Sequence, residues 1–247
     1  MLFTEAPLLE RFKRATRAGF AAVEIQFPYD TPLEQLQQAL FRNKLALVLH
    51  NLPAGNWAAG ERGIACLPDR VDEFRQGIDA ALTYAAALGV PQLNCLAGIR
   101  PAHVPSDTAR HVLVNNLGYA ALRLKAYGLK LLIEPINTFD VPGFFVSTTR
   151  QALELIDEVG ADNLFLQYDV YHMQRMEGDL AHTLATHIEK IAHIQIADNP
   201  GRHEPGTGEI NFDFLFAHLD RIGYQDWVGC EYKPATTTEA GLGWLKS

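Results

Sequence analysis

Short apolar runs and longer segments with helical spacing alternate along the chain. The runs are rich in Val, Ile, Leu and Phe and nearly continuous, which is typical of strands buried on both faces. They cover residues 21–27, 45–52, 91–97, 129–136, 163–170, 191–198 and 227–234. We therefore predict seven buried strands from these seven runs.

The segments between the runs have apolar residues on one helical face and helix signals at their ends. In the first of them, Leu8, Leu9, Phe12 and Ala15 share a face, and Gly19 provides the stop. The segments cover residues 8–19, 33–44, 71–89, 106–128, 148–160, 178–190 and 211–223. Strands that alternate with helices indicate parallel βα units.

This alternation predicts an α/β fold, a single (β/α)8 TIM barrel domain over residues 1–247, close to the roughly 250 residues typical of that fold. A closed barrel has eight strands and normally begins with one, whereas this chain begins with a helix. We therefore expect the first strand to be missing and the start codon to be assigned too far downstream.

A barrel without its first strand has a gap between two neighbouring strands. The strands that end near Phe27 and Tyr232 should face this gap and should not pair with each other. A doubly wound open sheet is the alternative, but no Gly-x-Gly-x-x-Gly turn follows the first predicted strand.

Composition narrows the class of protein. The net charge of −8 and the pI of about 5.6 argue against nucleic acid, because phosphate binding requires a basic face. No apolar run reaches the roughly 18 residues that suggest a membrane span, and the N-terminal segment does not read as a secretory signal. Three widely spaced cysteines, Cys66, Cys95 and Cys230, favour reduced thiols and a cytoplasmic protein. A homo-oligomer is possible, since the sequence does not determine the oligomeric state.

Polar residues stand at the ends of the predicted strands, where α/β barrels have their active sites. Glu134, Asp169, Gln195 and Glu231 are each embedded in an otherwise apolar run. Buried carboxylates must be paired or bound to a metal, and cations such as Arg202 are few nearby. Carboxylate and amide oxygens favour Mg²⁺ or Mn²⁺ over Zn²⁺. Loop capping or structural ion pairing is the alternative for these acids.

Glu134 and Glu231 come from strands on different sides of the predicted barrel mouth. Two carboxylates that flank a metal can move a proton from one carbon to the next, and the metal stabilises the intervening enediolate. His50 ends a strand, and His172 lies in the predicted loop after Asp169, so either could hydrogen-bond a substrate oxygen.

Two loops add candidate ligand contacts. Residues 198–210 form a Gly- and Pro-rich loop whose Arg202 is suited to anchor a substrate carboxylate, although a plain surface turn is the alternative. Residues 51–63 form a second loop that contains Trp57 and is either a water-excluding lid or a long connection.

These residues stand in long stretches that resemble the hydroxypyruvate isomerase family, within the xylose-isomerase-like barrels. The stretches are HNLPAGNWAAGERGIAC, LLIEPIN, QYDVYHMQRMEG, HIQIADNP followed by Arg202 and EPGTGEI, and VGCEYKP. The resemblance runs over almost the whole chain and implies proton transfer by Glu134 and Glu231. It further implies a metal site formed by Glu134, Asp169, Gln195 and Glu231. The substrate contacts that it implies are His50, His172 and Arg202.

The resemblance also implies a reaction. Hydroxypyruvate and 2-hydroxy-3-oxopropanoate (tartronate semialdehyde) would interconvert through an enediolate at a divalent metal, without a nucleotide cofactor. A 2-dehydrotetronate isomerase or a ketose 3-epimerase would use the same residues, so both remain alternatives. An apurinic endonuclease on the same barrel would need a zinc cluster and a basic surface, which the charge of −8 opposes. A catalytically inactive binding protein is opposed by the presence of both glutamates.

Overall fold

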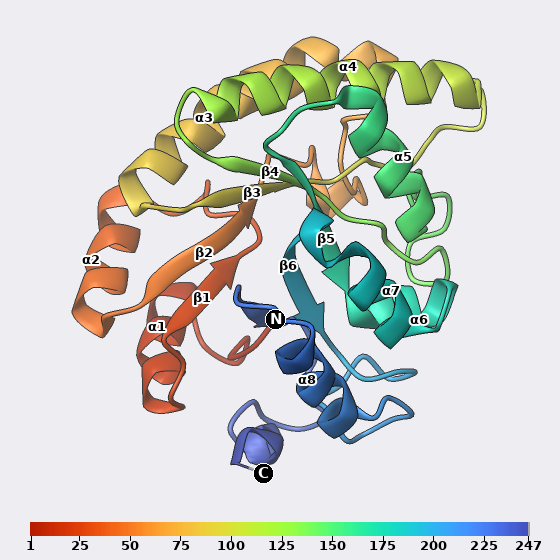
Figure 1. Cartoon of the computed structure of the whole chain (residues 1–247). Coiled ribbons are helices and arrows are strands. Elements are labelled where there is room, and N and C mark those ends of the chain that lie inside the picture. The colour runs from red at the N-terminus through yellow and green to blue at the C-terminus, as the bar shows by residue number, and fades with distance from the viewer. Residues whose placement is uncertain (247) are drawn as a thin grey trace.

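The sheet is curved and its seven strands follow one another in chain order (Figure 1). The computed structural model describes residues 1–246, so Ser247, the last residue of the expected domain, lies outside the described residues. All neighbouring strands are parallel. The strands are β1 Ala22–Ile25, β2 Ala46–Asn51, β3 Gln92–Cys95, β4 Lys130–Ile133, β5 Leu164–Asp169, β6 Ile191–Ile196 and β7 Val228–Cys230.

Helices connect the strands and cover the outer face of the sheet, as the sequence pattern predicts (Figure 1). The α-helices are α1 Leu8–Arg17, α2 Leu33–Asn43, α3 Val71–Leu88, α4 Ser106–Lys125, α5 Thr149–Val159, α6 Val170–Met176, α7 Leu180–His187 and α8 Phe212–Arg221. Short 3₁₀ helices are η1 Trp57–Ala59, η2 Pro68–Arg70, η3 Ile188–Lys190 and η4 Ala240–Lys246. The expected βα barrel, with one strand fewer than eight, is therefore confirmed.

Helix α6 corrects one local prediction. The sequence analysis placed His172 in a loop, but α6 begins directly after β5, and His172 lies in its first turn. The Asp169 side chain caps this helix by accepting hydrogen bonds from the backbone N–H groups of Tyr171 and His172. The helix was missed because its N-cap residue reads as the end of an apolar strand.

A gap separates β1 from β7. Within residues 1–246 these two strands do not pair, which confirms the expectation for the strands near Phe27 and Tyr232. The residues ahead of α1 lie beside β7 (Figure 1), where the Met1 amine donates a hydrogen bond to the Cys230 carbonyl at 3.3 Å.

The Glu24 side chain connects β1 to β6 across this gap. Its carboxylate contacts Nε2 of His193 at 2.8 Å and accepts a hydrogen bond from Nε2 of Gln195 at 2.7 Å. The carboxylate lies against Gly229 of β7, where any Cβ atom would overlap it. Glycine at this position therefore allows the close approach that links the two edges of the sheet.

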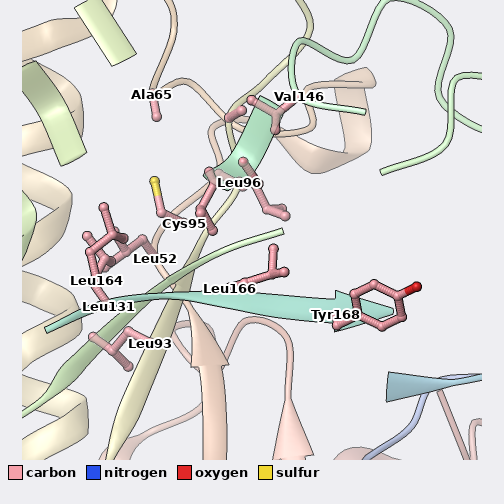
Figure 2. Close-up of a cluster of buried hydrophobic side chains, with 14 of the residues drawn as sticks. Leu52, Ala65, Leu93, Cys95, Leu96, Leu131, Val146, Leu164, Leu166 and Tyr168 are labelled. Atoms are coloured by element: carbon pink, nitrogen blue, oxygen red, sulfur yellow. The ribbon is translucent and has the colours of Figure 1, made fainter. Parts of the chain in front are cut away.

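The main hydrophobic core lies between the strands and the helices. Figure 2 shows part of it, where Leu93 of β3, Leu131 of β4 and Leu164 and Leu166 of β5 gather. These leucines are 0–2% exposed. This packing fixes the strands, and with them the polar residues at the strand ends.

Candidate active site

A cavity of about 650 Å³ opens at the carboxyl ends of the strands. Its wall includes all of the predicted site residues except Asp169, which lies buried beneath it. A larger space of about 1620 Å³ follows the gap between β1 and β7 and is lined mainly by apolar residues. The smaller cavity is the candidate active site, because the titratable groups converge there.

Four buried side chains form an acid cluster at the cavity floor. They are Glu134, directly after β4, Asp169 at the end of β5, His172 in α6 and Glu231, directly after β7. One ligand atom from each lies within 4.8 Å of the others. The structure therefore brings together the three predicted acids and adds His172, which the sequence analysis assigned to the substrate.

Burial and mutual repulsion disfavour negative charge in this cluster. Burial, reinforced by Glu231 and Asp169, raises the pKa of Glu134 well above its usual range, although Asn94 donates a hydrogen bond to its carboxylate at 2.8 Å. Burial also raises the pKa of Asp169 to about 7 against the opposing effect of Arg202. A proton or a cation is needed to balance these carboxylates.

The Asp169 carboxylate has one oxygen available for a cation. Oδ1 caps α6, whereas Oδ2 is fully buried and accepts no hydrogen bond from residues 1–246. A buried carboxylate oxygen without a hydrogen bond is costly, and a divalent cation would satisfy it. This oxygen and the neighbouring Glu134 and Glu231 therefore fit an oxygen-coordinated metal ion.

Arg202 extends from the loop after β6 onto the acid cluster. Its guanidinium donates a hydrogen bond to Glu231 at 2.5 Å and lies 3.7 Å from Oδ2 of Asp169. The second oxygen of Glu231 accepts a hydrogen bond from Gln26 at 2.7 Å. Glu231 is thus oriented by one charged and one neutral donor.

The Asp198 carboxylate anchors the loop that carries Arg202. It accepts hydrogen bonds from the backbone N–H groups of Asn199, Gly206, Gly208 and Ile210, at the start and far end of the loop. The predicted Gly-rich loop is therefore a hydrogen-bonded unit at the cavity rim.

Gln195 lies on the wall of the cavity but outside the acid cluster. Its amide oxygen accepts a hydrogen bond from Gln167 at 2.6 Å, and its amide nitrogen donates to Glu24. The amide oxygen has a second lone pair and is thus still able to bind a cation. The structure places this predicted ligand in a polar chain that crosses the barrel.

The two predicted histidines are buried, and burial lowers the pKa of both. The pKa of His50 falls to about 4 and that of His172 well below its usual range, so both rings are neutral near pH 7. Nδ1 of His50 lies 3.1 Å from the Asn51 carbonyl, to which it donates, and Nε2 has no partner within residues 1–246. Nδ1 of His172 lies 2.6 Å from the Asn137 amide nitrogen, and Nε2 faces the acids and lies 3.3 Å from the guanidinium of Arg202.

The sequence analysis missed the two amides that orient the glutamates. Gln26 holds Glu231, and Asn94 holds Glu134. Both stand in apolar runs near strand ends, which is the same signal that identified the acids. Extending that criterion from acids to amides would have found them.

In the metal-free protein, we expect the free energy of unfolding of Asp169→Asn to increase relative to that of wild type as pH rises. The raised pKa of Asp169 means that the folded state binds its proton more tightly than the unfolded state. The stabilisation that Asp169 contributes is fully present below the pKa that this group has in the unfolded chain. It is lost as pH rises through about 7. Asparagine does not titrate, and it keeps the oxygen that caps α6.

Urea unfolding of both proteins with a chelator, at about pH 5 and about pH 8, measures this difference. The comparison therefore reports the titration of Asp169 together with its effect on Glu134, whose pKa the Asp169 charge raises, and both contributions have the same sign. A difference in unfolding free energy that does not change with pH would contradict the raised pKa of Asp169.

Comparison with known proteins now assigns the class. The family model for the xylose isomerase-like TIM barrel matches residues 12–247, so the chain belongs to this family. It is 58% identical to a hydroxypyruvate isomerase of Escherichia coli (strain K12) over 245 residues, 99% of this chain and 95% of that protein. It is 46% identical to a 2-oxo-tetronate isomerase of Cupriavidus necator over 246 residues, 100% of this chain and 95% of that protein. The expected isomerase class is thereby confirmed.

A solved structure matches the whole fold. It is described as an AP endonuclease of family 2 from Brucella melitensis, has 42% sequence identity and superposes with a TM-score of 0.97. The match covers 99% of this chain and 95% of that chain.

Within residues 1–246, every helix is too short or too polar to cross a membrane.

Proposed function

We propose that this protein is a hydroxypyruvate isomerase, which interconverts hydroxypyruvate and 2-hydroxy-3-oxopropanoate. The observation that carries the proposal is the convergence of Glu134 and Glu231, from opposite sides of the barrel mouth, in one buried cluster. The 58% identity to the Escherichia coli hydroxypyruvate isomerase supports the three-carbon substrate.

The two glutamates divide the proton transfer. Glu231 is paired with Arg202 and serves as the carboxylate that removes a proton from C3 of hydroxypyruvate. Glu134, on the other side of the cluster, serves as the group that delivers a proton to C2. The C3 hydroxyl proton moves to the C2 oxygen, so C3 becomes the aldehyde and C2 the alcohol. Atoms and electrons balance within the substrate, and no redox cofactor is needed.

Glu134, Asp169, Gln195 and Glu231 would hold a divalent metal, Mg²⁺ or Mn²⁺. Oδ2 of Asp169, which accepts no hydrogen bond from residues 1–246, and the carboxylate oxygens of the three clustered acids support this choice. When bound, the ion polarises the substrate carbonyl and lowers the energy of negative charge on the adjacent oxygens.

His50, His172 and Arg202 orient the substrate in this proposal. The neutral ring of His50 offers Nε2 as an acceptor that has no partner within residues 1–246. The neutral ring of His172 presents Nε2 to the cavity beside Arg202. Arg202 lies against Glu231 and therefore faces the reacting end of the substrate. These contacts align C2 and C3 between the two glutamates.

We further propose a small hydroxy-oxo acid as the partner, in the cytoplasm. The net charge of −8 disfavours the DNA substrate suggested by the description of the Brucella structure. Cys66, Cys95 and Cys230 are all free thiols, as expected in a reducing compartment.

Proton NMR of hydroxypyruvate in D₂O, with the purified protein and Mg²⁺, tests the proposed function. We expect exchange at C3 together with the appearance of the aldehyde product. A parallel sample with 2-oxo-tetronate tests the activity named for the Cupriavidus relative. If the folded protein exchanges protons of the four-carbon acid alone, 2-oxo-tetronate rather than hydroxypyruvate is the substrate. If it exchanges protons of neither acid, the proposed isomerisation of these acids is overturned.

A further inference from the structure

The cavity wall carries four cationic side chains, and they differ in their ion pairing. Arg202 is paired with Glu231 and lies near Asp169. Arg175 forms an ion pair with Asp140 at 3.0 Å. The other two cations, Arg62 and Lys233, line the same cavity.

Arg62 and Lys233 form no ion pair with any carboxylate in residues 1–246. The carboxylate nearest to Arg62 along the chain, that of Glu61, is instead bound to Arg70 at 2.6 Å. An acid that enters the cavity therefore meets two positive charges that the protein has not neutralised.

The guanidinium of Arg62 is held in a fixed orientation. Its central carbon lies 4.1 Å from the centre of the Trp57 ring. Nη1 donates hydrogen bonds to the backbone carbonyls of Trp57 and Glu61, at 3.0 and 2.7 Å. Stacking and these two bonds order the group before any ligand binds, which lowers the entropic cost of binding.

The edge of Arg62 that these contacts leave open is formed by Nε and Nη2. Among the described residues these two nitrogens have no hydrogen-bond partner in the structure. Nε and Nη2 are the parallel donors that bind both oxygens of a carboxylate at once. The ammonium of Lys233, by contrast, is a flexible point charge on an exposed side chain.

We propose that Arg62 binds the carboxylate of the substrate and thereby selects hydroxy-oxo acids over neutral sugars. This inference rests on the proposed function, because it assumes an acid in the cavity. It assigns the loop of Trp57 to ligand recognition, and it leaves Arg202 at the reacting end with Glu231.

Kinetics of Arg62→Gln test this assignment. We expect KM for hydroxypyruvate to rise about 10- to 100-fold, with kcat changed less than about 3-fold, because the contact exists in both ground and transition states. Arg62→Lys should recover part of the loss. Arg75→Gln is the matched control, since Arg75 also stacks on an aromatic ring, Tyr119, but lies outside the cavity wall.

Inhibition by hydroxyacetone, in which a methyl group replaces the carboxylate, separates recognition from folding. Its inhibition constant should be the same for wild type and Arg62→Gln, whereas a merely structural role would weaken the binding of both ligands. An unchanged KM for hydroxypyruvate in Arg62→Gln, or the full loss in Lys233→Met instead, would overturn the proposal.

Failure of the proposed function would look different. If wild type does not isomerise hydroxypyruvate, calorimetric binding of the same acid still tests Arg62. Binding that weakens in Arg62→Gln but not in Arg75→Gln supports the carboxylate site, and equal binding in both variants overturns it.

Discussion

Glu231→Gln is expected to abolish isomerisation while the protein stays folded. The amide has almost the same shape as the carboxylate but cannot accept the C3 proton. The amide oxygen can still accept the hydrogen bond from Arg202, and the amide of Gln26 can rotate so that its own oxygen accepts from the new NH2 group, so the local packing is kept. Removal of a general base costs about 10²- to 10⁴-fold, and we expect the upper part of this range because Glu231 also belongs to the acid cluster.

Steady-state turnover of hydroxypyruvate, with circular dichroism as the folding check, measures this effect. Glu158→Gln is a suitable control, because it removes a carboxylate from an exposed ion pair with Arg110, and neither residue lines the cavity. Turnover within a few-fold of wild type in Glu231→Gln would remove Glu231 from the mechanism.

Chelation of the divalent metal is expected to eliminate turnover and to lower the melting temperature. Without the ion, the raised pKa values of Glu134 and Asp169 reflect unfavourable negative charge in the cluster. A metal at about 100 times its Kd adds about 2.7 kcal/mol to the stability. For a chain of this size that corresponds to a shift of about 5–10 °C.

Turnover and thermal unfolding, measured before and after EDTA treatment and after addition of Mg²⁺ or Mn²⁺, check both effects. Asp169→Asn should show a smaller thermal response to metal, because one ligand oxygen becomes an amide group. Full turnover with the metal content reduced to a trace would contradict a catalytic metal.

The pattern of the sequence was sufficient for the barrel and for the principal acids. Strands buried on both faces are nearly continuous in apolar residues, so an acid within such a run stands out, as Glu134 and Asp169 do. Parallel strands bring their carboxyl ends to one side, so the sequence also predicted that these acids meet. The unpaired β1 and β7 follow from the same count of strands.

Side-chain pairing was decided only by the tertiary structure. Gln195 was a predicted metal ligand, but its hydrogen-bond partners depend on strand register. Gln167 lies on the neighbouring strand and Glu24 lies across the gap. Helix α6 was hidden because Asp169 serves both as a strand end and as a helix cap. Local periodicity carries no information about such contacts.

The loops show the same division most clearly. The sequence determined that Arg202 and Arg62 stand in loops after strands, and that both are charged at neutral pH. Only the folded chain decided that Arg202 lies on Glu231, whereas Arg62 stacks on Trp57 with one edge open. Loop conformation depends on backbone and side-chain contacts formed after the barrel is assembled, so no repeating pattern in the sequence encodes it.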